Sequence, residues 1–366
     1  MTGIQRHQRI PILVFTGFLG SGKTTVLNYL TQQAALSRTL VLINEFGEIG
    51  LDHELVAHSK DDVVIEMSSG CLCCTIRGDL AKTLREAPSR FARGGEKWFD
   101  RVIIETTGLA DPAPILHTLM NDMQVSGRYN LAAVITAVDA VNGDDTLNRQ
   151  TESVKQAAMA DQLLITKTDL ADARTTAALR ERLGRLNPGA RQVVASNGVV
   201  DPTSLLRGGY FDPTRKSVDV QNWLNEEAYT DSHDHHHHDH DHDHDHDVNR
   251  HDAHIRSICF TVDEPIRGEV LDTWLDMLLK YRGADFLRIK GIINIADIDR
   301  PMVIHGVQHI FHPPVVMDAW PSDDRRSRIV FITRNIDESI LRQTLDVLTN
   351  SDIGEPIETV DEAPAA

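Results

Sequence analysis

Short apolar runs alternate with amphipathic stretches over the first 210 residues. Runs that are apolar at nearly every position are typical of strands buried on both faces of a parallel sheet, and the stretches between them have helical spacing. The predicted strands are residues 10–15, 39–44, 63–67, 102–105, 132–138, 162–166 and 192–195. The predicted helices are residues 24–33, 79–85, 114–120 and 173–186. This alternation predicts an α/β domain with a mostly parallel, doubly wound sheet.

The pattern changes after residue 211. Residues 212–254 contain few apolar side chains, and order resumes at residue 255 with a second periodic region. There we predict strands at 255–262, 286–293, 302–308 and 329–332, and helices at 268–280 and 337–349. The predicted domains are therefore a nucleotide-binding unit (1–211), a linker (212–254), a smaller α+β domain (255–350) and a flexible acidic tail (351–366).

Charge and hydropathy narrow the classes of function. The chain has 366 residues and a formal net charge of −17, which disfavours nucleic acid and anionic membranes as partners. No apolar run reaches the length of a membrane span. The N-terminal sequence MTGIQRHQRIPILVF lacks the apolar core and cleavage site of a signal peptide. We therefore expect a cytoplasmic protein.

A phosphate-binding loop follows the first predicted strand. The sequence from Gly17 to Thr24, GFLGSGKT, matches G-x-x-x-x-G-K-[ST] between a strand and a helix. Glycines let the backbone N–H groups face phosphate oxygens, Lys23 would reach the β- and γ-phosphates, and the Thr24 hydroxyl would ligate Mg²⁺. A chance glycine-rich turn is the weaker alternative. The predicted nucleotide-binding residues here are Gly17, Gly20, Ser21, Gly22, Lys23, Thr24 and Thr25.

Two further strand ends complete the predicted nucleotide site. Glu105 ends a buried strand where P-loop proteins hold Mg²⁺, and the Gly108 N–H could sense the γ-phosphate. The sequence Thr166-Lys167-Thr168-Asp169 is similar to the N-K-x-D motif, in which the carboxylate accepts hydrogen bonds that guanine offers and adenine does not. We predict GTP as the nucleotide, with Lys23, Thr24, Glu105 and Gly108 as the catalytic set, and Thr166, Lys167 and Asp169 at the base.

Cysteine and histidine suggest a transition metal. Cys71, Cys73 and Cys74 lie within four residues, and their thiolates suit zinc while leaving a coordination position open for exchange. Glu48 lies in a segment that could add a carboxylate. A redox pair of Cys71 and Cys74 stays open as the alternative.

A low-complexity tract rich in histidine and aspartate runs from Asp231 to Asp247. Imidazoles bind Zn²⁺, Co²⁺ or Ni²⁺ near neutrality, so the tract could load metal weakly; a solvated linker is the alternative. Its predicted ligands are His233, His235, His236, His237, His238, His240, His242, His244 and His246.

Taken together, these segments resemble the CobW-like family of GTPases, which is related to the nickel-insertion GTPases of urease and hydrogenase. The resemblance is carried by TGFLGSGKTT (16–25), INEFGEIGLD (43–52), GCLCC (70–74), ETTGLADP (105–112), TKTD (166–169), RIKGIINI (288–295) and GVQHIFHPP (306–314). It implies a slow GTPase that binds zinc or a similar ion close to the nucleotide and delivers it to client metalloenzymes. The family more often has Asn where this chain has Thr166.

The sequence therefore predicts a GTP-hydrolysing metallochaperone that uses Mg²⁺ with GTP and carries Zn²⁺, with Co²⁺ or Ni²⁺ also open. A cobalt-handling GTPase of cobalamin synthesis and a zinc buffer with vestigial GTPase activity are the alternatives, and an ATP-dependent kinase is disfavoured by Asp169. A nucleotide-dependent homodimer also stays open.

Overall fold

The first domain is built on a seven-stranded, fully parallel sheet. The computed structural model describes residues 9–45, 63–68, 73–207, 254–311 and 314–349. The strands lie in the order β3-β2-β6-β1-β7-β8-β9. Their bounds are β1 (Ile10–Gly17), β2 (Thr39–Glu45), β3 (Val63–Ser68), β6 (Arg101–Thr106), β7 (Tyr129–Asp139), β8 (Gln162–Thr166) and β9 (Arg191–Val194). Every predicted strand of this domain is present, and the predicted fold class is confirmed.

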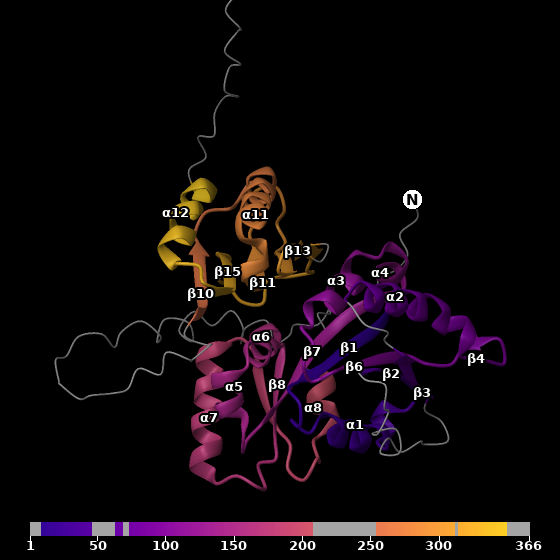
Figure 1. The fold of residues 1–366 in the computed structure, drawn as a ribbon. Helices are drawn as coiled ribbons and strands as arrows, with labels where there is room; N and C mark the ends of the chain where they lie inside the picture. The colour runs from indigo at the N-terminus through magenta and orange to yellow at the C-terminus, as the bar shows by residue number, and fades with distance from the viewer. Residues whose placement is uncertain (1–8, 46–62, 69–72, 208–253, 312–313, 350–366) are drawn as a thin grey trace, which may run out of the picture.

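Helices cover both faces of this sheet because successive residues of each strand point to opposite sides. In β1, Ile12 and Val14 pack under one helical layer, whereas Leu13 and Phe15 pack under the other. The first layer includes α2 (Cys73–Arg90), α3 (Ala113–Asn121), α4 (Met123–Arg128) and α6 (Thr151–Met159), and the second includes α1 (Lys23–Thr31), the 3-10 turn Ala34–Leu36 and α8 (Pro202–Arg207). Two further helices, α5 (Gly143–Arg149) and α7 (Ala173–Leu186), pack near β8 (Figure 1).

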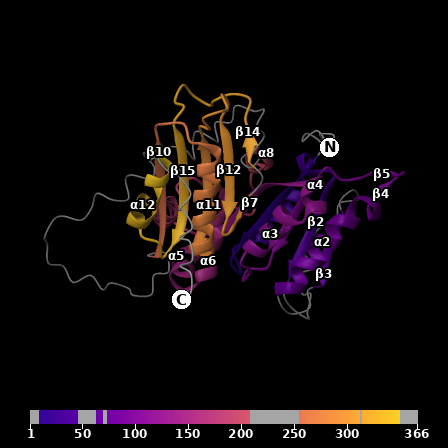
Figure 2. The same ribbon diagram turned by 90° about the horizontal axis from the view of Figure 1, so that it is seen from above.

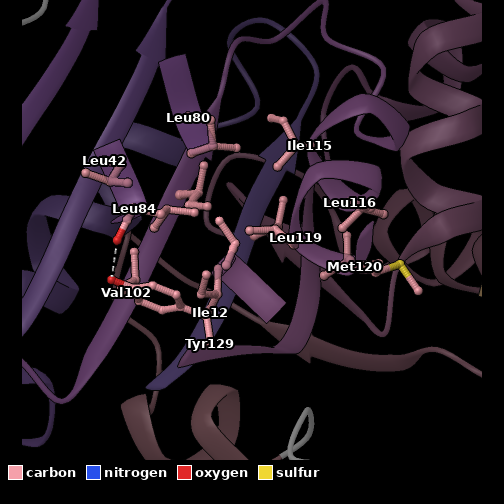
Figure 3. Packing of buried hydrophobic residues seen from close by; sticks show 14 of the residues in the cluster. Ile12, Leu42, Leu80, Leu84, Val102, Ile115, Leu116, Leu119, Met120 and Tyr129 are labelled. Atoms are coloured by element: carbon pink, nitrogen blue, oxygen red, sulfur yellow. Dashed lines mark hydrogen bonds between the residues drawn. The ribbon is translucent and has the colours of Figure 1, made fainter. Parts of the chain in front are cut away.

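The largest hydrophobic cluster lies between the sheet and the first helical layer. Figure 3 shows this packing at close range, including the buried hydroxyl of Tyr129, which donates a 2.8 Å hydrogen bond to the Leu84 carbonyl of α2. Burial raises the pKa of Tyr129, so the phenol stays protonated and can keep this bond. The labelled residues of the cluster come from β1, β2, β6, α2, α3 and β7: Ile12, Leu42, Leu80, Leu84, Val102, Ile115, Leu116, Leu119, Met120 and Tyr129.

The sequence prediction was wrong about the start of one helix and missed others. Helix α2 begins at Cys73, six residues before the predicted start at 79, so Cys73 and Cys74 occupy a helical turn rather than a loop. Helices α4, α5, α6 and α8 were not predicted. Each has nine residues or fewer, and so short a segment shows little periodicity and depends on tertiary packing. A two-stranded ribbon of β4 (Ala92–Arg93) and β5 (Glu96–Lys97) was also missed.

The second domain is an antiparallel sheet covered by two helices (Figure 2). Its strands lie in the order β10-β15-β11-β12-β13, with β14 also pairing with β12. Trp274 of the longer helix packs edge-on against Phe331 of β15, with ring centroids 5.9 Å apart. The elements are β10 (Ile255–Val262), α11 (Gly268–Arg282), the 3-10 turn Gly283–Asp285, β11 (Phe286–Ile293), β12 (Met302–Val307), β13 (Ile310–Phe311), β14 (Val315–Val316), β15 (Ser327–Arg334) and α12 (Glu338–Thr349).

The two domains share a continuous core and a buried ionic contact. Leu287, Val307, Ile310 and Ile332 of the second domain belong to the same hydrophobic cluster as α3 and α6. Beside it, Arg288 Nη2 and Lys290 Nζ lie 2.6 and 2.7 Å from Asp161 Oδ1.

We name Asp161, Arg288 and Lys290 the interdomain latch. Burial opposes ionisation of Asp161, but the charges of Arg288, Lys290 and His305 outweigh it and hold the pKa of this carboxyl well below its usual range. The latch is therefore ionic at neutral pH. In the parts of the chain that the structure describes, no helix has the length and apolar character that crossing a membrane requires.

Candidate functional site

The phosphate-binding loop joins the carboxyl end of β1 to α1. Gly17 and Gly22 have φ values of 140° and 84°, which only glycine adopts without strain. A side chain at position 17 would also meet the Ala137 carbonyl oxygen of β7, because a Cβ placed there would lie 2.4 Å from it. The loop is therefore built from glycines for two reasons, its backbone conformation and its close approach to the neighbouring strand.

Lys23 points back over this loop. Its buried ammonium donates to the carbonyl oxygens of Gly17 at 2.8 Å and Phe18 at 3.0 Å. The Nζ atom is thus held at the mouth of the loop, where a phosphate chain would enter. The role of Lys23 at the β- and γ-phosphates stays a prediction.

The predicted magnesium ligands meet beside the loop. Thr24 Oγ1 donates to Glu105 Oε1 at 3.2 Å, and Glu105 is almost fully buried at the end of β6. Next to it, the hydroxyl of Thr106 donates to that of Thr16 at 2.7 Å, tying the ends of β6 and β1 together. A hydroxyl and a carboxylate within contact distance form the oxygen-rich pair that Mg²⁺ prefers, so the residues fit the ion.

The segment that follows β6 lies directly on the phosphate-binding loop. A Cβ built on Gly108 would lie 2.5 Å from the backbone nitrogen of Leu19, so no larger residue fits there without displacing one of the two loops. Gly108 is therefore close enough to the phosphate-binding loop for its position to respond to what the loop holds.

Thr166 ties the predicted base loop to the phosphate-binding loop. Its hydroxyl, buried at the end of β8, donates to the Ser21 carbonyl at 2.7 Å. The sequence left open whether this threonine could replace the more usual asparagine. Within this structure the shorter side chain still makes the connection.

Lys167 is held in a fixed position beside the base loop. It has a positive φ of 54°, and its ammonium contacts the buried Asp139 carboxylate at 2.7 Å. Burial alone would raise the pKa of Asp139, but hydrogen bonds from Lys167, Asn142 and the Val141 N–H outweigh it and lower that pKa. The charged pair leaves the apolar stem of Lys167 as the surface a purine could stack on.

Asp169, the predicted guanine reader, is exposed and anchored by one oxygen. Its Oδ1 accepts a 2.7 Å hydrogen bond from the backbone N–H of Asn197, in the turn after β9. That turn also closes on α1, because a Cβ on Gly198 would lie 2.7 Å from Thr25 Cγ2. Loops after β1, β8 and β9 thus come together around one site.

Comparison with known proteins agrees with this geometry. Residues 11–194 match the family described as the CobW/HypB/UreG nucleotide-binding domain, and residues 255–349 match the C-terminal domain of the cobalamin synthesis protein CobW. The chain belongs to the CobW/HypB/UreG family of P-loop GTPases. The predicted family and GTPase class are thereby confirmed.

Among CobW-like relatives, the chain is 29% identical to a protein named zinc chaperone YjiA from Escherichia coli, over 91% of this chain and 96% of that one. It is 30% identical to one named zinc chaperone CobW from Pseudomonas aeruginosa, over 92% and 91%. The crystal structure of Zn(II)-bound YjiA GTPase from E. coli is similar, with a TM-score of 0.64 and 26% identity over 93% of this chain and 99% of that one. The comparison covers both domains.

The predicted metal ligands of this CobW-like chain lie mostly outside the described residues. Cys71, Glu48 and the histidines from His233 to His246 are outside them, while Cys73 and Cys74 begin α2, without a description of their side chains. Helix α2 follows β3, whose carboxyl end lies at the same edge of the sheet as the phosphate-binding loop. Since β3 and β1 are three places apart, about 15 Å separates the two strands. The metal-ligand assignments stay predictions; within the described ranges no cluster of three or more potential metal-ligating side chains occurs.

A separate cavity of 680 Å³ lies where α2 and α3 meet β13 of the second domain. His117 and His309 meet there edge-on, with ring centroids 4.6 Å apart, and Arg85 and Asp122 line the same cavity. The sequence prediction missed this junction because its residues come from distant segments.

The site also contains buried polar residues that no motif marked. Asp139, at the end of the buried strand β7, could have been found by the same rule that selected Glu105, since a carboxylate at a buried strand end is unusual. Gln156 is fully buried in α6 and donates to the carbonyls of Gly108 and Ala110. A glutamine on the apolar face of a short helix was the available signal, and α6 itself was not predicted.

Proposed function

We propose that this chain is a GTP-hydrolysing metallochaperone that binds zinc and transfers it to client metalloproteins. The observation that carries the proposal is that the phosphate-binding loop and the helix that begins with Cys73 and Cys74 follow strands that end at one edge of a single sheet. The phosphate-binding loop leaves β1 at that edge, and the chain that leads to Cys73 and Cys74 leaves β3 there. The relatives named zinc chaperone, which span both domains, support zinc as the cargo.

Hydrolysis would depend on charge placed around the phosphates. Lys23, now on two loop carbonyls, would turn to the β- and γ-phosphates and stabilise the charge that develops as the terminal bond breaks. Thr24 and Glu105 would hold Mg²⁺, which neutralises phosphate charge when bound. The N–H of Gly108, a residue that packs closely against the phosphate-binding loop, would donate to the γ-phosphate and lose this bond after hydrolysis.

GTP selection would come from Asp169, whose exposed carboxylate can accept from the N1–H and the amino group of guanine. Thr166 and the Asn197 backbone fix the loop that carries it. Asp139 holds Lys167 at the side of the purine. These contacts hold the base loop in place, and a loop held in its binding conformation loses less freedom when it binds a ligand.

Zinc delivery requires that nucleotide and metal affect each other. Only one strand, β2, lies between β3 and β6. A shift of the loop after β6 would therefore occur close to the elements that lead to the cysteines. Coupling of this kind is reciprocal in binding free energy and usually changes affinity about 5- to 150-fold. We assign client recognition to the second domain, whose hydrophobic core is continuous with that of the first domain.

The test is zinc affinity measured with GTP, with GDP and without nucleotide. We expect the affinity to change about tenfold or more between nucleotide states, and replacement of Cys71, Cys73 and Cys74 by serine to abolish tight binding. Cys259→Ser, in the partly buried strand β10, is the matched control and should leave zinc binding unchanged. Zinc affinity that is indifferent to nucleotide would leave the zinc-buffer alternative, and tighter GTP-dependent binding of Co²⁺ than of Zn²⁺ would favour the cobalt alternative.

A further inference from the structure

Gln156 makes a buried connection between α6 and the loop that follows β6. Its side chain is fully buried, and Nε2 donates to the carbonyl oxygens of Gly108 at 3.2 Å and Ala110 at 2.9 Å. The backbone carbonyl of Gln156 accepts from the hydroxyl of Thr136 in β7 at 2.8 Å. The side-chain amide of Gln156 therefore connects α6 to two alternate peptides of the loop, while its backbone carbonyl connects α6 to the sheet.

The neighbouring residue of α6 holds the other end of the same loop. Lys155 Nζ lies 3.3 Å from Asp111 Oδ2, and both side chains are largely buried. Asp111 also accepts from the Ala113 N–H at the start of α3. Two consecutive residues of α6 thus hold the loop at Gly108, Ala110 and Asp111. Leu109, which lies between the first two of these, is exposed.

We propose that Gln156 is a positioning residue for GTP hydrolysis, which holds the loop of residues 107–111 so that Gly108 stays against the phosphate-binding loop. The two acceptors are the carbonyls of the peptides 108–109 and 110–111, so the amide fixes two alternate peptide planes and restricts the backbone at Gly108. Because a loop without these bonds would sample many backbone conformations, Gly108 would meet the γ-phosphate less often.

The same helix carries this positioning toward the second domain. Figure 1 shows α6 between the large sheet and the second domain, and Ala158 and Met159 belong to the hydrophobic cluster that both domains share. Two residues after the helix ends, Asp161 enters the interdomain latch. Helix α6 would therefore transmit to the second domain a change in the position of the loop that the γ-phosphate causes.

The chain offers a matched control for the test. Gln162, in β8, is also fully buried and donates from Nε2 to one backbone carbonyl, that of Leu205 at 2.9 Å, but it does not contact the loop of residues 107–111. We would compare Gln156→Met with Gln162→Met in the full chain, measuring kcat, affinity for GDP, affinity for a non-hydrolysable GTP analogue and thermal unfolding.

Gln156→Met should lower kcat and the affinity for the GTP analogue about tenfold or more, since two hydrogen bonds are lost, and should leave GDP affinity within about twofold. Gln162→Met should lower stability to a similar degree and leave the GTP and GDP constants unchanged. If both variants alter kcat equally, or if Gln156→Met weakens GDP and the GTP analogue by the same factor, Gln156 is only structural and the proposal is overturned.

Gln156→Glu supplies a second readout if the methionine variant does not fold. A buried carboxyl has a raised pKa and donates only while protonated, so the ratio of variant to wild-type kcat should rise as the pH falls. A flat ratio would count against the proposal. The inference rests on the GTPase part of the proposed function and does not involve zinc: wild-type protein without GTPase activity would refute that function, whereas an active Gln156→Met protein refutes only this inference.

Discussion

The interdomain latch predicts that Asp161→Asn destabilises the protein far more than loss of an exposed ion pair. The carboxylate of Asp161 lies 2.6 Å from Arg288 and 2.7 Å from Lys290, and it also accepts from the Val134 N–H at 2.9 Å. The exposed fractions of the three charged side chains are 11%, 3% and 17%. Asparagine has almost the same shape but removes the charge that compensates the buried guanidinium of Arg288.

The magnitude follows from this burial. Removing one partner of a buried ion pair costs about 3–5 kcal/mol, because the remaining charge is left uncompensated. Among the described residues, Arg288 Nε and Nη1 have no hydrogen-bond partner, so Asp161 supplies most of the compensation. For a chain of this size we expect a fall in Tm on the order of 10 °C.

The measurement is thermal and urea unfolding of Asp161→Asn beside Asp100→Asn. Asp100 pairs with Arg38 at 2.6 Å, but both side chains are about half exposed, and exposed pairs contribute less than about 1 kcal/mol. A double variant, Asp161→Asn with Arg288→Met, should recover part of the loss because one unpaired charge is removed. Equal destabilisation by the two single variants would refute the assignment of the latch as buried and ionic.

The lowered pKa of Asp161 also predicts how the stability of the protein changes with pH. Since the folded-state pKa of Asp161 is lowered, its contribution to stability is complete above the unfolded pKa of about 3.9 and is lost as the pH falls through the folded value. The stability gap between wild type and Asp161→Asn should therefore be constant from neutral pH to about pH 5 and shrink below about pH 4. A gap that widens on acidification would contradict the reasoning.

Two further predictions concern the base loop. Thr166→Val keeps the shape of the side chain and removes the hydroxyl that reaches Ser21; we expect weaker binding of both GTP and GDP, by about 5- to 10-fold for one buried hydrogen bond, checked by titration calorimetry, and unchanged affinity would show that the tie is dispensable. Asp169→Asn reverses part of the donor and acceptor pattern that guanine meets, so GTP should bind more weakly and xanthosine triphosphate more tightly in competition assays. Wild-type protein that hydrolyses ATP as well as GTP would contradict the assignment of Asp169.

Local pattern was sufficient where one segment determines its own structure. Strand β8 and helix α7 were predicted to the residue, because an uninterrupted apolar run gives the strand and the Asp172 side chain caps the helix by accepting from the Thr175 N–H at 2.8 Å. The phosphate-binding loop and the end of β6 were found for the same reason. Each motif is complete within a short stretch, of eight consecutive residues for the loop and seven for the end of β6.

Contacts between distant segments were not accessible in this way. The sequence gives no sign that Asp161 pairs with Arg288, 127 positions away, since charged residues are common and only the fold brings these two together. Helix α6 was missed because its buried face contains Gln156 among small apolar residues, a composition that makes sense only once the loop it holds is known. The start of α2 at Cys73 was misplaced because glycine and cysteine near a predicted metal site favoured a loop.

The position of β3 has a consequence for how cargo could leave the protein. Among the strands that the structure describes, β3 is the last on its side of the sheet, and α2, which begins with Cys73 and Cys74, is the next described element along the chain. The nucleotide site, by contrast, is enclosed by strands on both sides of β1. Under the proposed function, a client protein would therefore approach Cys73 and Cys74 from the β3 side of the sheet, and metal exchange and nucleotide exchange would use separate entrances.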